Sequence, residues 1–414
     1  MDFEIPREIS AILAELDAFI EREIKPLEEA NRQYFDRRRE WARTDWENGG
    51  RPRAEWEEVL AEMKRRADKA GHLRFALPRE LGGQEGSNLA LAMIREHLAH
   101  KGLGLHNDLQ NESSIVGNFP LVMMMWDFGT EAQKAEFLPG LITGEKRMGF
   151  GLTEPGHGSD ATYMEATGRL DGEEWLIEGA KRFNSGLHDA THDLVFARTS
   201  DDRGAAHGIT AFIVPTDTPG FEVVEMDWTF NMPSDHALVR LDGVRIPAHS
   251  VLGEIDDGLI VAQHFLHENR IRQAASSLGA AQFCIDRSVA YAKQRTTWGK
   301  PLAVNQAIQF PLAELHTEAE MVRNLVYRTA WELDRQNHMA VTEQVAMANY
   351  RANRLVCQAA DRAIQVHGGE GYTRNQPFEH IYRHHRRYRI TEGAEEIQIR
   401  KIAADLFGFG RRNR

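Results

Sequence analysis

The spacing of the apolar residues changes twice along this chain, and this change restricts the possible folds more than any other feature. Up to about Gly149 they recur every three or four residues, as on helices that bury one face, and Pro6 is well placed to begin the first helix. The next stretch has short β-type runs separated by turn sequences such as Asp171-Gly172. After Gly258 the helical spacing returns and lasts almost to the C-terminus.

These three stretches predict an α+β protein of three domains. We expect an N-terminal helical domain over residues 1–148, a middle domain over 149–257 and a C-terminal bundle of four long helices over 258–414. Short strands with hairpin-like turns favour an antiparallel sandwich or barrel in the middle domain over βαβ units. A helix is expected from about Ala54 to Lys69, and the expected strands are 174–178, 194–198, 209–215, 221–225 and 237–246.

The charge and cysteine content argue against several classes of protein. A net charge of −12 disfavours a nucleic-acid partner, because phosphate binding needs a basic surface. Cys284 and Cys357 form no CxxC pair, so neither a disulfide framework nor a structural zinc site is expected. The N-terminus has no basic-then-apolar leader, and no run reaches the roughly 20 apolar residues of a membrane span. We expect a cytoplasmic protein without membrane insertion.

Three charged clusters have ordinary explanations. His264 and His267 stand beside Glu268, where a metal is conceivable, but two histidines on a helix are more often surface or packing residues, so no metal is expected. Tyr382–Arg389 interleaves arginines with tyrosines, as some nucleic-acid sites do. On an acidic chain such a patch is more often a charged subunit contact or a polar loop. The charged segment 31–53 has no assigned partner.

Three segments carry residues suited to chemistry. In Tyr388–Ile399, Glu392 stands directly before Gly393 at the start of the last apolar helix, where backbone amides favour negative charge. Glutamate before glycine is also an ordinary capping arrangement. The other two segments are Gly-Leu-Thr-Glu-Pro-Gly-His-Gly-Ser-Asp at 151–160 and Gln-Val-His-Gly-Gly-Glu-Gly-Tyr at 365–372. The first lies where the helical pattern gives way to the β pattern, and it is also explained as a tight loop.

In their order and spacing these segments resemble the acyl-CoA dehydrogenase family of flavoenzymes, over nearly the whole chain. The resemblance implies the same succession of three domains and noncovalent FAD as cofactor. It also implies dehydrogenation of an acyl-CoA thioester to trans-2-enoyl-CoA, as in fatty acid β-oxidation. Glu392 would take the α-proton, flavin N5 would accept the β-hydride, and the electrons would pass to electron-transferring flavoprotein. A desolvated glutamate of raised pKa suits this base.

The resemblance assigns one set of flavin contacts to the region after residue 149. Phe150 would begin the loop, Leu152 and Thr153 would meet the isoalloxazine edge, and Ser159 would meet the thioester substrate or the cofactor phosphates. A weaker match places Phe183 and Ser185 against the flavin, since Phe stands for the family's usual Trp and Ser-Gly for Thr-Asn.

A second set usually binds the cofactor of a neighbouring subunit in this family. The resemblance therefore implies a homo-oligomer, either a dimer or a dimer of dimers (a homotetramer). The set comprises Arg295, Thr297, Gln306, Gln365, Gly368 and Gly369. Glu396 would keep a further flavin contact, although Ala394 replaces the family's threonine.

For the substrate, the resemblance implies that Arg270 lines the pocket and that His267–Asn269 contact the coenzyme A portion. Gly393 would let the thioester approach. Glu268 is a rival base, but family members with a base on this helix place it directly before the arginine. Two other classes stay open: an oxygen-using flavin oxidase or monooxygenase on the same fold, and a non-catalytic acyl-CoA-binding relative. Monooxygenases generally lack the glutamate, and oxidases are typically longer.

Overall fold

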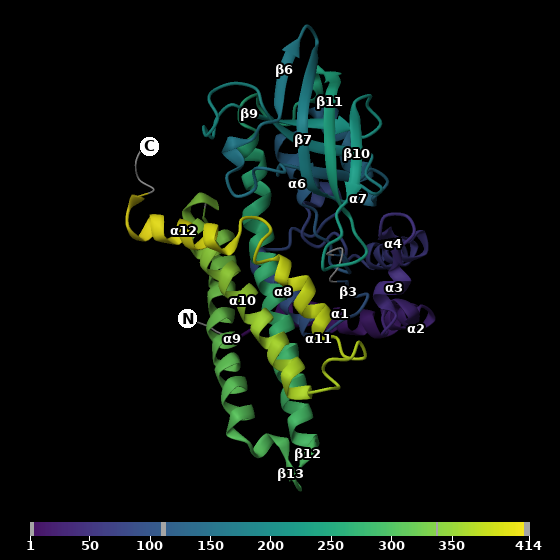
Figure 1. Ribbon diagram of the computed structural model, residues 1–414, viewed down its shortest axis with the longest axis vertical. Coiled ribbons are helices and arrows are strands. Elements are labelled where there is room, and N and C mark those ends of the chain that lie inside the picture. Colours follow the sequence, from purple (N-terminus) through teal and green to yellow (C-terminus); the bar gives the residue numbers. More distant parts are fainter. Residues whose placement is uncertain (1–3, 109–112, 337, 410–414) are drawn as a thin grey trace. The chain divides into compact units, whose positions relative to one another are not determined.

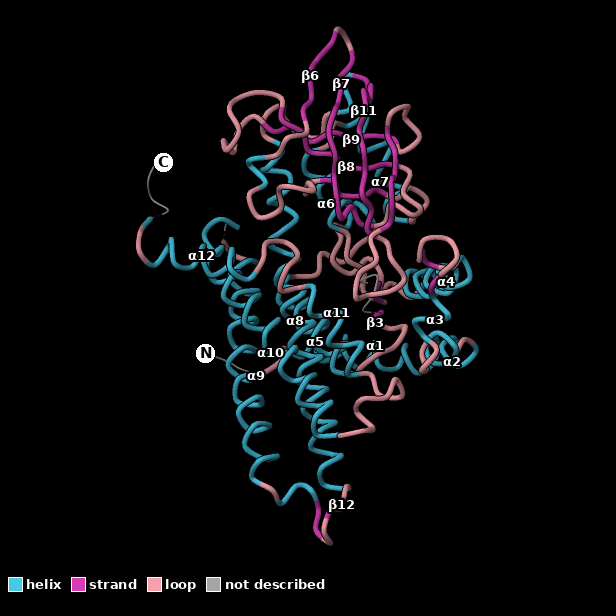
Figure 2. Tube along the Cα trace, in the orientation of Figure 1, coloured by secondary structure: helices cyan, strands magenta, loops and turns pink. Residues whose placement is uncertain are grey.

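The computed structural model describes residues 4–108, 113–336 and 338–409 (Figure 1; Figure 2). By packing, the chain forms two compact units, which we describe separately. The helical unit consists of Met1–Ala42, Ala54–Asn118 and His267–Arg414, and the sheet unit of Arg43–Arg53 and Phe119–Leu266. The expected order of N-terminal helices, middle sheet and C-terminal helices is confirmed. The three-domain division remains our interpretation of the sequence.

Amphipathic helices build the N-terminal part of the helical unit. The bounds of α4 (Ala54–Lys69) confirm the predicted helix, and its residues Trp56, Leu60 and Met63 are buried at helical spacing. Helix α5 (Asn88–His100) begins after Ser87, whose Oγ accepts the backbone N–H of Ala90 at 3.1 Å. The other elements are α1 (Arg7–Phe19), a π-helical turn η1 (Ile20–Ile24), α2 (Lys25–Ala30), η2 (Arg32–Tyr34), α3 (Arg39–Arg43), η3 (Arg79–Leu81), β3 (Asn107–Asp108) and β4 (Ser113–Ser114).

Long helices dominate the C-terminal part. They are α8 (Gly258–Gln294), α9 (Gln306–Leu333) and α10 (Thr342–His367), followed by the shorter α11 (Phe378–Arg387) and α12 (Glu395–Leu406). Between them lie the hairpin of β12 (Thr296–Thr297) and β13 (Lys300–Pro301), η6 (Leu302–Val304) and η7 (His338–Val341). From His267 onward α8 belongs to the helical unit. Within the described ranges, every helix is too short or too polar to span a bilayer.

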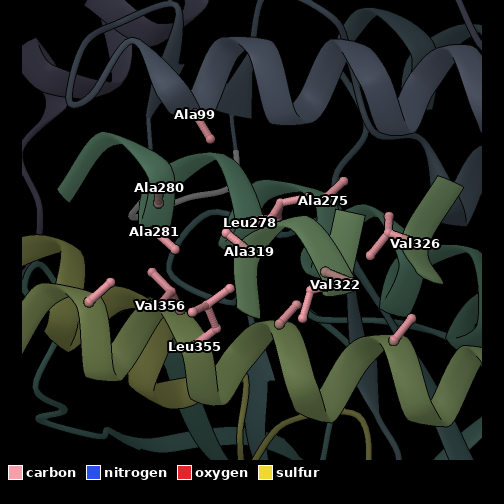
Figure 3. Packing of buried hydrophobic residues seen from close by; sticks show 14 of the residues in the cluster. Ala99, Ala275, Leu278, Ala280, Ala281, Ala319, Val322, Val326, Leu355 and Val356 are labelled. Carbon is pink, nitrogen blue, oxygen red and sulfur yellow. The ribbon is translucent and has the colours of Figure 1, made fainter. Parts of the chain in front are cut away.

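Small side chains fill the core between α8, α9 and α10 (Figure 3). Ala275 and Ala281 of α8 pack in one cluster with Ala319 of α9 and Val356 of α10, and Ala99 of α5 joins them. The distance between packed helices depends on the side chains at their contact, and alanine lets the helices approach closely. Polar side chains on neighbouring helices are therefore brought within hydrogen-bonding reach of one another.

The expectation of a polar loop at Tyr382–Arg389 is wrong, and the alternative of a charged subunit contact stays a prediction. Most of this cluster belongs to α11, and His384 and His385 lie on its buried face. Arg39, which is 3% exposed, donates to Oε1 of Glu379 in α11 at 2.6 Å. The charged segment 31–53 thus has a partner at its beginning.

A seven-stranded sheet forms the centre of the sheet unit. Its strands are β5 (Met148–Gly151), β6 (Thr167–Asp171), β7 (Glu174–Ser185), β8 (His192–Arg198), β9 (Ile209–Pro215), β10 (Phe221–Met226) and β11 (His236–Pro247). The order is β10-β11-β7-β6-β8-β5, with β9 paired to β8; β8 runs parallel to β5 and β6, and the other pairings are antiparallel. All five predicted strands are present. Strands β5 and β6 were not predicted because glycines and exposed polar residues hide their alternation.

The sheet unit also contains helices that precede the sheet in sequence. They are α6 (Pro120–Phe128) and α7 (Glu131–Thr143), with the turns η4 (Ala161–Tyr163) and η5 (Ala248–Ser250). The hairpin of β1 (Thr44–Asp45) and β2 (Arg51–Pro52) packs here too. The ring centroids of Trp46 and Trp228 are 5.5 Å apart, and the carbonyl of Gly50 accepts the N–H of Ser234 at 2.7 Å. The rest of the charged segment is therefore anchored in the sheet unit.

Candidate active site

Glu392 lies in the turn between α11 and α12, with its backbone in the left-handed region at φ 55°. Non-glycine residues rarely adopt this conformation, and such strained positions cluster at functional sites. Gly393 follows with φ 92°. A Cβ at Gly393 would lie 3.1 Å from Nη2 of Arg270 and 3.3 Å from Nε2 of Gln398, so glycine suits both the backbone and the space.

Two carboxamides of α8 hold the carboxylate of Glu392. Nδ2 of Asn269 donates to its Oε1, and Nε2 of Gln273 donates to the same oxygen at 2.8 Å. The two residues are one helical turn apart and share a face of α8. Hydrogen bonds to a carboxylate oxygen favour its ionised form. The half-buried carboxylate is therefore oriented and biased toward the state that accepts a proton.

Arg270 holds the backbone of Glu392. Its Nε and Nη2 donate to the carbonyl oxygen of Glu392 at 3.0 and 2.5 Å, and Nε2 of Gln398 donates to the same oxygen at 3.3 Å. Burial lowers the pKa of Arg270, and the nearby charge of Glu392 counteracts that effect. The residue expected in the substrate pocket therefore fixes the turn that carries the proposed base.

The neighbouring residues of α8 have other partners. Oε2 of Glu268, the rival base, accepts Nη2 of Arg272 at 2.9 Å. His267 is buried, and its Nε2 lies 3.1 Å from Oγ1 of Thr342. Within the part of the chain that the structure describes, no three histidine, cysteine or acidic side chains are grouped as a metal site requires.

In the sheet unit, the loop 151–160 is fastened to β7. The carbonyl of Thr153 accepts the N–H of Arg182 at 2.9 Å, and that of Leu152 accepts Nζ of Lys181 at 3.4 Å. Phe183 comes next along β7, so Leu152, Thr153 and Phe183 lie close together, as the resemblance implies for a flavin site. Three further residues of the set lie nearby in sequence: Phe150 packs 5.1 Å from Phe196 between ring centroids, and Ser159 and Ser185 are exposed.

A buried ion pair beneath this loop was not predicted from the sequence. Nζ of the fully buried Lys181 lies 2.8 Å from Oε1 of Glu154, whose carboxylate also accepts the N–H groups of Glu165 and Ala166 at 2.6 and 2.9 Å. Burial raises the pKa of Glu154, but the charge of Lys181 and these hydrogen bonds outweigh burial, so the pKa lies below its usual value. The charged pair fixes the path of the loop.

Phe183 occupies a strained position in β7. Arg182 pairs with Leu238 and Asn184 pairs with Ala237, so Phe183 is the extra residue of a β-bulge, with φ 64°. Its side chain is 49% exposed. A phenylalanine with positive φ is a genuine outlier. The bulge holds an aromatic ring at the surface beside the loop 151–160.

The second predicted set begins far from Glu392 within the helical unit. Arg295 follows the last residue of α8, roughly 37 Å from Arg270 along the helix at about 1.5 Å per residue. Thr297 lies in β12, and Gln306 begins α9. In Figure 1 the β12–β13 hairpin lies at the end of the long helices opposite to α12. A single chain therefore does not bring Arg295 to the turn of Glu392.

The end of α10 joins this distant set. His367 stacks on Tyr291 of α8 with ring centroids 4.2 Å apart, which places Gln365 and Gly368 near the end of α8. Glu396, by contrast, is an exposed residue at the start of α12, near Glu392.

Several segments of both sets leave room for a ligand. A Cβ added at Gly156, Gly368 or Gly369 would meet no heavy atom within 4 Å. Trp298, at the tip of the β12–β13 hairpin, is 97% exposed with φ 46°. Open glycine backbone suits the close approach of phosphates, and exposed aromatic rings suit flat ring systems. The residues present therefore fit a phosphate-bearing cofactor with a flat ring.

Comparison with known proteins gives family matches along nearly the whole chain. Residues 28–145 match the model described as "Acyl-CoA dehydrogenase, N-terminal domain". Residues 149–243 match the middle domain of the same family, and residues 256–407 match its C-terminal domain.

Individual proteins show the same likeness. The 3-(aryl)acrylate reductase of Clostridium sporogenes is 33% identical over 357 residues, which cover 84% of this chain and 91% of that protein. A chain solved in a structure of the electron transferring flavoprotein of Acidaminococcus fermentans is 27% identical, with a TM-score of 0.78 and coverage of 98% and 99%. A glutaryl-CoA dehydrogenase from Mycobacterium smegmatis, solved in complex with FADH2, is 25% identical with a TM-score of 0.78 and coverage of 98% and 95%.

Proposed function

Because this chain belongs to the acyl-CoA dehydrogenase family of FAD-dependent oxidoreductases, we propose that it converts an acyl-CoA thioester to the trans-2-enoyl-CoA with Glu392 as the base. One observation carries the proposal. The carboxylate of Glu392 accepts two amide donors while its backbone is held in a strained turn by Arg270. A base in this state has a fixed direction and is held ionised, so it can accept an α-proton, although the two donors oppose the raised pKa that desolvation alone would give.

Each residue around Glu392 has a separate role in the proposed reaction. Asn269 and Gln273 aim the carboxylate, and Arg270 fixes the carbonyl of the turn. Gly393 leaves the backbone accessible to the thioester, whose carbonyl oxygen needs hydrogen bonds as negative charge develops. His267 is the candidate contact for the coenzyme A portion. FAD, when bound, supplies the hydride acceptor that no side chain can provide.

The sheet unit and the distant end of the helices would hold the cofactor. Open glycine backbone and exposed rings support this assignment. From one chain we assign Phe150, Leu152, Thr153, Ser159, Phe183, Ser185 and Glu396. From a neighbouring subunit we assign Arg295, Thr297, Gln306, Gln365, Gly368 and Gly369, so the active form would be a homo-oligomer, a dimer or a homotetramer.

The remaining parts of the proposal follow the family. Electrons would pass to electron-transferring flavoprotein, and the likeness to a chain solved with such a flavoprotein supports this acceptor. We place the reaction in the cytoplasm, within fatty acid β-oxidation or a related acyl-CoA pathway.

Anaerobic incubation of the purified protein with a panel of acyl-CoAs tests the proposal. At least one should bleach the flavin absorbance. Glu392→Gln should still bind acyl-CoA and perturb the flavin spectrum, but reduce the flavin about 10²-fold more slowly or worse, because a general base is lost. Glu268→Gln is the matched control on α8 and should reduce the flavin at close to the wild-type rate. The reverse behaviour of the two variants would show that the base is misassigned.

A further inference from the structure

Two lines of hydrogen bonds converge on the carboxylate of Glu392, and every link donates toward it. In the shorter line Nη1 of Arg272 donates to Oδ1 of Asn118, and Nδ2 of Asn118 donates to Oδ1 of Asn269 at 2.9 Å. Nδ2 of Asn269 then donates to Glu392. Arginine only donates and a carboxylate only accepts, so the two ends fix the direction of both amides between them.

The longer line crosses the interior of the helical unit. Oγ of Ser277 lies 3.0 Å from Nδ1 of His385 and donates to Oδ1 of Asn353 at 2.7 Å. Nδ2 of Asn353 donates to Oδ1 of Asn349 at 3.2 Å, and Nδ2 of Asn349 donates to Oε1 of Gln273 at 3.4 Å. Gln273 completes the line through its bond to the catalytic carboxylate.

Backbone carbonyls fix the direction of this longer line. Nδ2 of Asn353 also donates to the carbonyl of Tyr388 at 3.0 Å, and Nδ2 of Asn349 to that of Arg270 at 3.0 Å. A carbonyl only accepts, so turning either amide round would place oxygen against oxygen. Both asparagines are therefore held with their donors facing these carbonyls.

The first link of the longer line is a neutral histidine. Since Ser277 gives its proton to Asn353, Nδ1 of His385 must donate to Ser277. Burial, followed by the charge of Arg387, lowers the pKa of His385 to about 3. His385 therefore remains a neutral donor across the physiological pH range.

The side chains of the longer line are buried as well as fixed in direction. Gln273, Ser277, Asn349 and Asn353 are 3%, 0%, 2% and 0% exposed. Hydrogen bonds in such low-dielectric surroundings polarise one another, so a donor several links away strengthens the last one. That last bond is the one made to Glu392.

We propose that Asn349 and Asn118, each one link behind the amides that contact Glu392, are positioning residues that aim its Oε1 and keep the carboxylate ionised. The inference rests on the proposed function in taking Glu392 as the base. Without Asn349, Gln273 loses the donor that fixes its orientation, and without Asn118, Asn269 loses its own. Fewer aligned donors favour the protonated carboxyl, so the pKa of Glu392 should rise.

The charged groups around the turn are not mutated in these variants, but Asn118→Leu leaves Nη1 of Arg272 without its acceptor, so a shift in Asn349→Leu is the cleaner report on an amide line. Within the helical unit these groups are His267, Glu268, Arg270 and Arg272 on α8, Arg354 on α10, Arg387 on α11, and Arg389, Glu395 and Glu396 beside the turn.

The test compares Asn349→Leu and Asn118→Leu with Ser288→Ala. Ser288 is 0% exposed and its Oγ donates to the carbonyl of Cys284 at 2.7 Å within α8, so its loss breaks a buried hydrogen bond outside both lines. Asn118 is half-buried in the segment before α6, so its substitution is less disruptive than one in the core. Asn118→Leu can therefore test the proposal even if Asn349→Leu does not fold.

The pKa of Glu392 is read by infrared difference titration of the flavin-loaded protein, with its carboxyl band assigned by Glu392→Gln. Each leucine variant should raise this pKa by about one unit, roughly a tenfold change in the proton equilibrium, and Ser288→Ala should leave it unchanged. Stopped-flow measurements give the rate of flavin reduction by acyl-CoA as a function of pH. The acid limb of this pH–rate profile should move to higher pH by the same amount, and the rate at high pH should return to within about threefold of wild type.

An unmoved carboxyl pKa, or a rate that falls equally at every pH, would overturn the positioning role. The infrared titration needs no turnover. If the pKa moves while no acyl-CoA reduces the wild-type flavin, the positioning role stands and the proposed function fails.

Discussion

Of the six non-glycine residues with left-handed backbone in the described ranges, Phe183 and Glu392 stand at positions that the family resemblance connects with chemistry, and Trp298 stands beside Thr297 of the second set. Phe183, Trp298 and Glu392 have φ of 64°, 46° and 55°. Each such position costs on the order of 1–3 kcal/mol and persists only where its surroundings enforce it. A β-bulge holds the backbone of Phe183 in this conformation, and the tip of a hairpin does so for Trp298. Hydrogen bonds from Arg270 hold the backbone of Glu392. At Phe183 and Glu392 the strain and the motifs therefore coincide, whereas Glu85, Asp201 and Asp256 have left-handed backbone outside the predicted sites.

Phe183→Gly should separate the strain from the aromatic contact. Glycine relieves the left-handed backbone, which offsets its entropic cost, so stability should change by less than about 1 kcal/mol. FAD affinity should fall by about tenfold because the ring is lost. The measurements are flavin release on dilution and thermal unfolding of the flavin-free protein.

Phe183→Trp is the control, since it restores the residue usual in the family. It should hold FAD within about threefold of wild type. If Phe183→Gly bound FAD as tightly as wild type, the assignment of Phe183 to the flavin site would be wrong.

Sequence reasoning proposed Glu392 as the base, but it placed Asn269 against coenzyme A instead of against Glu392, and it missed Gln273 and Asn349. The glutamate stands in a recognisable Glu-Gly pair, whereas Asn269, Gln273 and Asn349 are ordinary helix residues in sequence. Their role depends on the close packing of α8 and α10 and on which way each amide turns. Only the spacing of Asn269 and Gln273, one turn apart beside Arg270, gave a signal, and it is a weak one.

At the level of elements, the start of α12 fixes the turn that carries Glu392. Glu395 is 7% exposed and accepts bidentate hydrogen bonds from Arg389 at 2.8 and 2.8 Å and from Arg354 of α10 at 3.1 and 3.2 Å. The hydrogen bond from Arg389, joined by that from Arg354, lowers the pKa of Glu395 to about 2, although burial opposes this.

Glu395→Gln should destabilise the protein by about 2 kcal/mol at pH 7, because two half-buried arginines lose their counter-charge and solvent weakens each ion pair. The folded-state pKa lies below the unfolded value, so the unfolded chain binds more protons between them. The stabilisation by Glu395 is therefore complete above about pH 4.5 and is lost as the pH falls toward about 2.

Urea denaturation at pH 7, 5 and 3.5 measures this loss. The exposed Glu396→Gln is the neighbouring control and should change stability by less than about 0.5 kcal/mol. A gap between Glu395→Gln and wild type that does not shrink on acidification would contradict the ion-pair explanation.

Sequence patterns predicted elements well where one periodicity dominated. The bounds of α4 were predicted because its apolar stripe is regular, and the strands were predicted where residues alternate, as in β11, or form a continuous apolar run, as in β8 and β9. Helix α11 was missed because its buried face consists of His380, His384 and His385 beside Phe378 and Ile381. Histidines counted as polar concealed that face. Gly179 and Ala180 interrupt the alternation of β7, so the predicted strand ended too early.

At the scale of the whole molecule, the distance between Arg295 and Glu392 predicts complementation between defective subunits. If each cofactor takes contacts from two chains, a hybrid of Glu392→Gln and Arg295→Ala subunits contains one intact site. Each variant alone should be nearly inactive. Co-expression with random pairing should restore about a quarter of the wild-type sites, as expected for a two-fold dimer.

The matched control pairs Glu392→Gln with Arg270→Ala. Both residues belong to one cluster of one chain, so no hybrid of these variants regains a complete site. Equal recovery in both mixtures, or recovery in neither, would contradict a shared cofactor site. Size-exclusion chromatography with light scattering confirms that hybrids form.

The directed amide lines also make the interior of this protein observable. Gln273, Asn349 and Asn353 carry side-chain NH2 protons that water reaches only when the surrounding helices part. Deuterium should enter these groups at the rate of that opening, far more slowly than at surface asparagines. Bound acyl-CoA that stabilises the turn of Glu392 should slow this exchange further. The exchange rates of three buried amides therefore report how often the surrounding helices open.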